Sequence, residues 1–318
     1  MTAPVVVADG LRKRYGKVVA LDGLSFDVPA GKVVGLLGPN GSGKTTTVAI
    51  LSTALRPDEG TAAVCGHDVA GHAAEVRTLI GFAAVDPNLT GAENLTLIAR
   101  LSRVPRRDAR RRASELLARF GLADAAGRLV RTYSGGMRRR LDLAAALVHR
   151  PPVLFLDEPT TGLDPESRRS LWDMVRELVA EGTTVLLTTQ YLEEADVLAD
   201  YVVIIDQGRA VQTGTPASLK HTIGSAIIEL AFPSAGDAAR AARRLAGQHF
   251  KPQQTGSSLE LRAATGSAAV VDVVSALEGS GIRPTAVEIR EPTLDDVFLT
   301  LTGNRTVPLP RASTRAAS

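Results

Sequence analysis

Short, wholly apolar runs alternate with longer stretches of helical periodicity through the first two thirds of the chain. Residues 32–37, 153–156 and 184–188 are typical of strands buried on both faces. Residues 44–55 and 165–180 carry apolar positions at helical spacing, which predicts helices. Strands that alternate with helices in this way predict an α/β fold with a mostly parallel core sheet.

Other patterned segments flank this core. Residues 5–8 and 23–28 are expected to be short strands, and residues 91–120, rich in arginine and alanine, to be helical. The pattern changes near residue 220. From there it predicts strand, helix, strand, strand, helix and strand at residues 226–232, 235–246, 250–254, 259–262, 267–277 and 285–290, an order found in ferredoxin-like modules.

We therefore expect a large domain over residues 1–219 and a small α+β domain over residues 220–303. The second domain could serve dimerisation or another accessory role. Residues 304–318 are rich in Pro, Ser, Thr and Arg, offer little to bury, and are expected to be disordered.

Composition narrows the classes of protein. With 318 residues, 44% of them hydrophobic, the chain can bury a sizeable core, and its single cysteine, Cys65, excludes an intrachain disulfide and favours a reducing cytoplasm. The net charge of +3 is too small to indicate nucleic acid, and no basic stripe with interleaved aromatic residues occurs. No run approaches the roughly 18–20 apolar residues of a membrane span, and the N-terminus lacks a secretion pattern. We expect a chain that is soluble by itself and meets a membrane only through a partner.

A glycine-rich loop follows the first buried strand and opens a helix. Its residues GPNGSGKT at 38–45 fit the phosphate-loop pattern, in which glycines let backbone N–H groups surround phosphates and the helix N-terminus faces the same anion. Lys44 can bridge the β- and γ-phosphates, and the Thr45 hydroxyl can ligate Mg²⁺. The predicted nucleotide contacts are Gly38, Pro39, Asn40, Gly41, Ser42, Gly43, Lys44, Thr45 and Thr46. A chance glycine-rich turn would explain neither the strand before the loop nor the helix after it.

Two acids close the second buried strand. Asp157 and Glu158 follow residues 153–156, so they reach the strand's carboxyl end, the edge where α/β sheets bind ligands. There Asp157 can hold the Mg²⁺ shell and Glu158 can polarise an attacking water as general base. Paired acids could instead cap a helix, but that would leave the phosphate loop unexplained.

The segment YSGGM at residues 133–137 lies between these two motifs, and an alanine-rich helix follows it. It resembles the signature of the ATP-binding-cassette (ABC) ATPases. In that family, Ser134, Gly135 and Gly136 would contact the γ-phosphate of ATP held by the opposite subunit. The resemblance implies MgATP hydrolysis, a homodimer that sandwiches two nucleotides, an antiparallel β region and a helical subdomain at about residues 88–150.

Further segments resemble the same family. Residues 161–164 (TGLD) are similar to the loop that crosses its dimer interface, which implies a role for Asp164, and Tyr15 is similar to the aromatic residue that stacks on adenine. At the position of the family's usual histidine stands Gln190, with no histidine nearby. A carboxamide does not take up a proton near neutral pH, so Glu158 remains the base and Gln190 a positioning group.

Three longer segments narrow the resemblance. TTQYLEEAD, SGGMRRRLDLA and EPTLDDVFL are similar to daunorubicin/doxorubicin-resistance ATP-binding subunits. That resemblance implies an ATPase on the inner face of the cell membrane. It would energise a separately encoded permease that exports an amphipathic small molecule, with no nucleic-acid partner.

One departure from the family leaves alternatives open. The family's glutamine loop has no counterpart, since no glutamine precedes Gln190. Asp86 or Asn88 could substitute in part; otherwise coupling is impaired, or the chain is a degenerate regulatory cassette. A soluble cassette that acts on ribosomes or DNA would carry two cassettes or a long coiled coil, and neither occurs.

Two smaller features complete the sequence. Residues 100–112 contain a cluster of arginines. This cluster indicates either a solvent-exposed face or a surface that contacts lipid headgroups or acidic residues of the permease. Thr293 and Asp296 are spaced to cap a short final helix.

Overall fold

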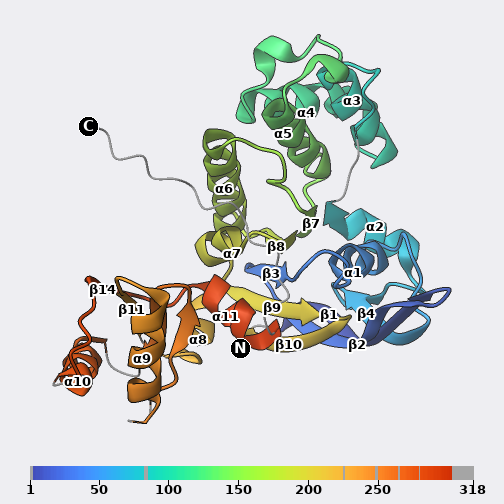
Figure 1. Ribbon diagram of the computed structural model, residues 1–318. Helices are drawn as coiled ribbons and strands as arrows, with labels where there is room; N and C mark the ends of the chain where they lie inside the picture. Colours follow the sequence, from blue (N-terminus) through green and yellow to red (C-terminus); the bar gives the residue numbers. More distant parts are fainter. Residues whose placement is uncertain are drawn as a thin grey trace. The chain divides into compact units, whose positions relative to one another are not determined.

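The computed structural model describes residues 3–81, 85–224, 226–247, 250–263, 266–278 and 280–302 (Figure 1). The chain divides into two compact units, Met1–Thr215 and Pro216–Ser318. This division lies a few residues before the boundary expected at 219/220, because helix α8 (Pro216–His221) belongs to the second unit. The tail expected to be disordered, 304–318, lies outside the described residues.

A six-stranded sheet in the order β10-β9-β3-β8-β7-β6 forms the core of the first unit. Its strands are β3 (Val33–Leu37), β6 (Ile80–Gly81), β7 (Val153–Asp157), β8 (Thr184–Thr189), β9 (Tyr201–Asp206) and β10 (Arg209–Gly214). All neighbours are parallel except the pair β9–β10. The predicted, mostly parallel core sheet is confirmed.

A second sheet, β2-β1-β4-β5, is antiparallel. Its strands are β1 (Pro4–Tyr15), β2 (Val18–Pro29), β4 (Glu59–Val64) and β5 (His67–Asp68). The first two are much longer than the strands expected at 5–8 and 23–28. Exposed polar residues alternate with buried ones along them, and register shifts around Gly10 interrupt the apolar pattern that the sequence shows.

Outside the helical region between β6 and β7, the described helices of this unit are α1 (Lys44–Leu51), α2 (Ala73–Leu79), α6 (Pro165–Ala180) and α7 (Leu192–Leu198). Helix α1 is shorter than the helix expected at 44–55. Thr53 adopts a left-handed conformation (φ 63°), which ends the helical backbone.

A helical region lies between β6 and β7 (Figure 1). It contains α3 (Gly91–Leu101), α4 (Arg106–Arg119), α5 (Gly135–Ala146) and the 3₁₀ turns Ala123–Ala125 and Val130–Thr132. The single helical stretch expected at 91–120 is broken after Leu101. Arg103 is left-handed (φ 62°), and Pro105 disfavours helical backbone in the residue before it.

The second unit has a four-stranded antiparallel sheet in the order β12-β13-β11-β14. Its elements after α8 are β11 (Ala226–Ala231), α9 (Ala235–Ala246), β12 (Gln253–Thr255), β13 (Ser258–Ala263), α10 (Gly266–Leu277), β14 (Ala286–Arg290) and α11 (Leu294–Thr302). This strand order is that of a split βαβ, or ferredoxin-like, module. The expected cap of the last helix is present: Thr293 N donates to Asp296 Oδ2 (2.8 Å) and Asp296 N to Thr293 Oγ1 (3.3 Å).

Within the described ranges, no helix has the length and apolar character that crossing a bilayer requires.

Candidate nucleotide-binding site

The carboxyl ends of three adjacent parallel strands meet at one edge of the core sheet. Strand β8 lies between β3 and β7 (Figure 1). Because both pairs are parallel, the loop after β3, the acids at the end of β7 and Gln190 after β8 lie at the same edge. Such an edge is where open α/β sheets bind ligands. The predicted phosphate loop, acidic pair and glutamine are therefore brought to one side of the sheet.

The phosphate loop is closely packed from behind. A Cβ on Gly38 would lie 2.3 Å from the Ile205 carbonyl oxygen, and one on Gly43, which is left-handed at φ 109°, 2.6 Å from the carbonyl oxygen of Ala20. Gly41 also has positive φ (81°) but faces open space. Ser42 is buried, and its Oγ has no hydrogen-bond partner among the described residues. Only glycine fits this backbone, and the loop keeps an unsatisfied polar atom, as expected of a cradle for a polar ligand.

Lys44 lies inside the loop that precedes it. Its Nζ donates to the carbonyl oxygens of Gly38 (2.8 Å) and Pro39 (3.1 Å) and lies 3.8 Å from Glu158 Oε1. The side chain is 4% exposed. Burial lowers the pKa of Lys44, and the charges of Glu158 and Asp157 oppose that effect. A buried ammonium beside the loop is the group that a phosphate would satisfy.

Asp157 and Thr45 converge from two elements. Thr45 Oγ1, at the start of α1, lies 3.4 Å from Asp157 Oδ1, at the end of β7. Hydroxyl and carboxylate oxygens are hard ligands of the kind that Mg²⁺ prefers. No three His, Cys, Asp or Glu side chains gather elsewhere in the described residues to hold a metal. Two protein oxygens fit Mg²⁺, which is commonly held by one or two side chains together with substrate phosphates.

Thr188 joins the two acids and was not predicted from the sequence. Its Oγ1 donates to Asp157 Oδ1 (2.5 Å) and accepts from the Glu158 backbone N–H (3.1 Å). Thr188 lies directly opposite Asp157 in the β7–β8 register. That pairing depends on strand register, which the sequence does not show. The only sequence feature that could have indicated Thr188 is a polar residue at the end of an apolar run.

Glu158 is held in a strained backbone conformation. Its φ is 46°, in the left-handed region that non-glycine residues rarely occupy. The Thr188 carbonyl accepts a second hydrogen bond from its N–H (3.1 Å), and Thr161 Oγ1 donates to its carboxylate (3.3 Å). Strain of this kind often occurs at functional sites. Here it accompanies a half-buried carboxylate beside Lys44.

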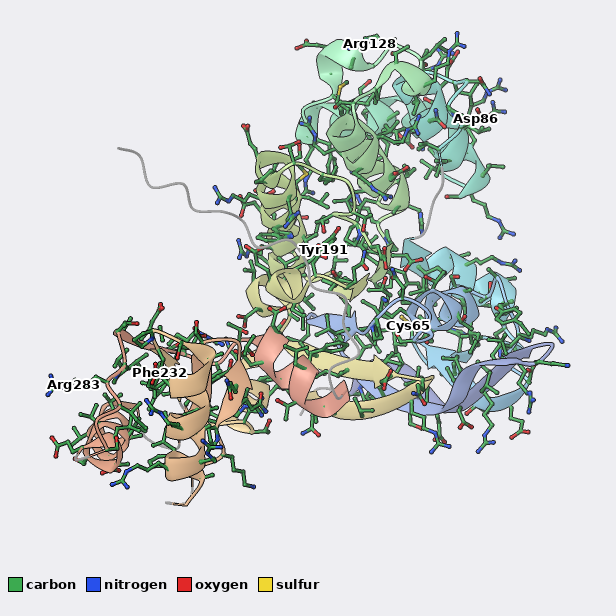
Figure 2. All side chains as sticks on the ribbon, in the orientation of Figure 1. Cys65, Asp86, Arg128, Tyr191, Phe232 and Arg283 are labelled. Atoms are coloured by element: carbon green, nitrogen blue, oxygen red, sulfur yellow. The ribbon has the colours of Figure 1, made fainter. Side chains whose placement is uncertain are left out.

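Gln190 is half-buried and directly follows β8. The next residue, Tyr191 (Figure 2), donates its N–H to Thr189 Oγ1 (2.9 Å) and has the Arg168 guanidinium 5.2 Å from its ring centroid. Tyr191 thus fixes the loop that carries Gln190. Gln190 therefore lies at the sheet edge where Glu158 also lies, and its role as a positioning group stays a prediction.

Tyr15 ends β1 and is 50% exposed. It is the register partner of Val18 at the start of β2, and β2 continues to Ala20, against which Gly43 packs. An exposed ring near the phosphate loop is free to stack on a flat ligand.

The signature residues lie apart from these groups. Ser134 and Gly135 are exposed at the N-terminus of α5, where Ser134 Oγ accepts from Met137 N (3.2 Å). A Cβ on Gly136 would lie 2.8 Å from Ser167 Oγ, and Ser167 donates through both its N–H (2.9 Å) and Oγ (2.6 Å) to Asp164. These hydrogen bonds lower the pKa of Asp164. The signature and Asp164 are thus joined through Ser167, and no interaction found in the described residues connects Ser134 with the phosphate loop.

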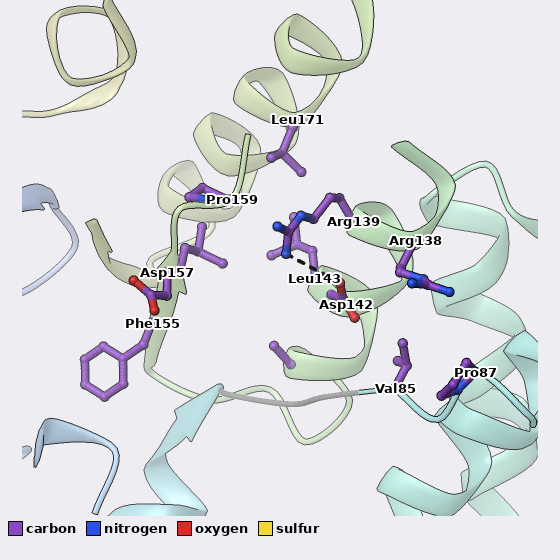
Figure 3. Close-up of a pocket in the computed structure, with 12 residues that line it drawn as sticks. Val85, Pro87, Arg138, Arg139, Asp142, Leu143, Phe155, Asp157, Pro159 and Leu171 are labelled. Carbon is purple, nitrogen blue, oxygen red and sulfur yellow. Dashed lines mark ion pairs between the residues drawn. The ribbon is translucent and has the colours of Figure 1, made fainter. Parts of the chain in front are cut away.

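A pocket of about 350 Å³ lies between α5 and the end of β7 (Figure 3). Pro87, Arg138, Arg139 and Asp142 line one part of it, and Asp157 another. Burial raises the pKa of Asp142 to about 6, although Arg139, 3.9 Å away, has the opposite effect. The pocket does not include Lys44 or Glu158 among its lining residues, so it adjoins the candidate site without containing it.

Asp86 and Asn88, considered as substitutes for a missing glutamine, lie in the loop before α3. Figure 2 labels Asp86. Asp86 Oδ1 accepts from Asn88 N (2.8 Å), and the Asp86 N–H donates to Asn94 Oδ1 (2.7 Å). The carboxylate therefore stabilises its own turn, and its proposed role toward Mg²⁺ stays a prediction. Phe82 and the two residues after it lie outside the described residues.

Together, a phosphate loop between strand and helix, an acidic pair on the adjacent sheet edge and a serine-capped glycine pair on a separate helix define an ATP-binding cassette, a class of ATP hydrolases. The ABC transporter family matches residues 21–161, and the family "ATP-binding protein DrrA1-3-like, C-terminal domain" matches residues 214–302. The chain belongs to the ABC transporter ATP-binding proteins, with a DrrA-like C-terminal domain.

Individual relatives agree over nearly the whole length. Daunorubicin resistance ATP-binding protein DrrA2 of Streptomyces coeruleorubidus is 50% identical over 96% of this chain and 97% of its own. Daunorubicin/doxorubicin resistance ATP-binding protein DrrA of Streptomyces peucetius is 47% identical over 94% and 92%. The solved ATP-binding subunit of an ABC transporter has a TM-score of 0.62 at 27% identity, over 69% of this chain and 92% of its own. A dimeric ATP-binding cassette bound to ADP and Pi has a TM-score of 0.60 at 25% identity, over 66% and 98%.

These matches confirm the predicted fold class, a P-loop ABC ATPase with a small α+β C-terminal domain.

Proposed function

We propose that this chain binds and hydrolyses MgATP to power a separately encoded membrane permease that exports an amphipathic small molecule. The observation that carries the proposal is the shared sheet edge, where Lys44 lies 3.8 Å from Glu158 and Thr45 lies 3.4 Å from Asp157. The full-length similarity to relatives named for daunorubicin and doxorubicin resistance supports drug efflux as the process served.

In this proposal the phosphate loop holds the nucleotide. Backbone N–H groups of the glycine-rich loop and the N-terminus of α1 face the phosphates, and Lys44 exchanges its loop carbonyls for phosphate oxygens. Thr45 and Asp157 would hold Mg²⁺, and the bound ion would offset negative charge on the phosphates. Tyr15 stacks on the adenine ring.

Glu158 accepts the proton of the attacking water, and Gln190 orients that water or a phosphate oxygen through its carboxamide. Thr188 holds the base through the Glu158 backbone N–H. The φ of 46° sets Glu158 apart from the extended backbone of β7, which ends at Asp157.

Ser134, Gly135, Gly136 and Asp164 act on a nucleotide bound to a second copy of the chain. Ser134 and Gly135 are exposed at the N-terminus of α5, and Asp164 is exposed at the N-terminus of α6, apart from the phosphate loop. This exposure supports the arrangement, because a half-site that faces outward requires a partner to complete it. Two copies would form two equivalent sites. The dimer would work on the inner face of the cell membrane beneath the permease.

The test combines hydrolysis with transport. Glu158→Gln should reduce phosphate release at least 100-fold, since a general base contributes about 10²–10⁴-fold, while ATP binding is retained. Glu177→Gln, which alters an exposed acid on α6, is the matched control and should keep normal turnover. Normal turnover by the Glu158 variant would reject Glu158 as the base.

In vesicles that contain the permease, the native chain should drive ATP-dependent uptake of doxorubicin and the Glu158 variant should not. ATP hydrolysis without transport of any drug tested would leave the ATPase assignment intact and reject drug efflux. Absence of phosphate release from the native chain, alone and with its permease, would instead favour a degenerate regulatory cassette.

A further inference from the structure

Exposed arginines and leucines gather where α3 passes into α4. Leu101 is 75% exposed at the end of α3, and Leu97 one turn earlier is 43% exposed. The arginines around the turn are exposed as well. We call this surface the α3–α4 patch; it comprises Leu97, Arg100, Leu101, Arg103, Arg106 and Arg110.

The four arginines of the patch form no ion pair with any residue that the structure describes, whereas their neighbours on α4 are engaged. Arg111 pairs with Asp108 (3.2 Å) and Glu115 (2.6 Å). Arg112 is drawn inward, where its guanidinium donates to the carbonyl oxygens of Leu147 and Val148. The fold therefore neutralises or buries some arginines of this region and leaves four unpaired and exposed.

Arg103 occupies a position where glycine is the usual residue. It follows the C-terminus of α3 in a left-handed conformation (φ 62°), and its N–H and that of Val104 satisfy the last carbonyls of the helix. A side chain in this conformation costs free energy that glycine would avoid. Local stability thus does not explain an arginine at this position.

We propose that the α3–α4 patch binds the anionic surface of a lipid bilayer directly. Guanidinium groups pair well with phosphate, and exposed leucines can enter the headgroup boundary beside them. A lipid surface also supplies charge without fixed geometry, which suits arginines spread over two helices and their connecting turn. Residues 91–119 contain no aromatic residue, which disfavours single-stranded nucleic acid as the ligand.

This inference goes beyond the proposed function, in which the membrane is reached through the permease. It predicts a second, direct contact that needs neither permease nor ATP. Hydrolysis and lipid binding therefore fail independently, and each has its own measurement.

The test is co-sedimentation of the full-length chain with vesicles of phosphatidylcholine alone or enriched in phosphatidylglycerol. The native chain should sediment with the anionic vesicles and dissociate as salt is raised, because exposed charges are screened. Each patch arginine removed should weaken binding about fivefold. Arg103→Gly is the most informative variant, since the fold should tolerate or gain from it. Leu101→Ser should also weaken binding, with less dependence on salt.

Arg111→Gln is the matched control, because Arg111 is exposed on the same helix but already paired. It should bind vesicles nearly as well as the native chain. All variants should keep the phosphate-release rate of the native protein.

Equal vesicle binding by the native chain and the combined Arg100→Gln, Arg103→Gly, Arg106→Gln and Arg110→Gln variant would overturn the proposal. So would tight binding of a DNA duplex without vesicle binding, which would assign the patch to nucleic acid. Binding only to vesicles that contain the permease, lost in the combined variant, would overturn it in favour of acidic permease residues.

Discussion

Two helix N-termini in the first unit, those of α1 and α5, have groups suited to binding an anion, but they differ in how closely other residues surround them. At α1 the loop is packed from behind by Ala20 and Ile205, and a buried lysine lies within it. At α5, Ser134 and Gly135 are exposed and only Ser167 lies close behind Gly136. The first N-terminus is completed by its own chain and the second is left open. In the proposed function, the first N-terminus binds the nucleotide of its own chain and the second meets the nucleotide of another copy.

The largest effect should come from filling the closed loop. Gly38→Ala would place a methyl group 2.3 Å from the Ile205 carbonyl oxygen and 2.5 Å from Ser42 Oγ, so the loop must shift. We expect ATP affinity to fall at least about 100-fold, or about 3 kcal/mol. Titration with a fluorescent ATP analogue measures this. Gly127→Ala, where the added methyl meets open space, should leave affinity unchanged.

A change at the exposed N-terminus of α5 should affect ATP hydrolysis while leaving ATP binding intact. Ser134→Ala should leave ATP binding by a single chain intact but slow hydrolysis about 30-fold, because it removes a hydrogen-bonding group offered to the partner's nucleotide. It also removes the cap of α5, at a cost of about 1 kcal/mol.

Ser234→Ala controls for that cap, since Ser234 caps α9 in the second unit through the same bond, with Asp237 N (3.1 Å). Both variants should lose similar stability, and only Ser134→Ala should lose turnover. If the two variants slowed hydrolysis equally, the assignment of Ser134 to a partner's site would be wrong.

A smaller effect is expected from Thr188, which supports the closed site from the side. Thr188→Val removes the hydroxyl that bonds Asp157 and accepts from Glu158 N, and turnover should fall about tenfold with ATP affinity nearly unchanged. Thr184→Val changes the opposite end of β8, where the hydroxyl accepts from Gly31 N. The Thr184→Val control should be less stable than the native chain, but its turnover and its ATP affinity should stay unchanged.

The smallest effect on turnover should come from a change at Asp142. This residue lies within α5, away from its N-terminus, and lines the pocket shown in Figure 3. Its pKa is raised from 3.8 to about 6, because the folded protein favours the neutral carboxyl group. The resulting contribution to folding stability is fully present below pH 3.8 and is lost as pH rises through 6. Asp142→Asn should flatten this dependence and stabilise the protein at pH 7 by up to about 3 kcal/mol.

Thermal unfolding between pH 4 and pH 8 measures the effect. Asp173→Asn, on the exposed face of α6, should retain the pH dependence of the native chain. A native unfolding midpoint that does not change with pH would exclude Asp142 as its source.

The sequence predicts the parts of the site that are local in the chain. The phosphate loop, the acids after β7 and the serine before α5 each form one short segment with its own strand or helix, so spacing places them. Thr188 and Ser167 could not be found in this way, because their roles arise from strand register and from helix packing between distant segments. The same holds for β1 and β2, whose lengths depend on pairing around bulges.

The segment that follows the C-terminus of α5 is anchored to strand β6. His149 Nε2 donates to the Ile80 carbonyl oxygen (2.9 Å), and burial lowers the pKa of that histidine, which favours the neutral ring. Arg112 holds the adjacent carbonyls. Helix α5, about 18 Å long, is therefore held beside β6 just beyond its C-terminus, while Ser134 at its N-terminus is exposed. If the helix rotated by about 10° about this anchored end, Ser134 would move by about 3 Å, so a small movement beside β6 would be larger at the end that we propose meets a second copy.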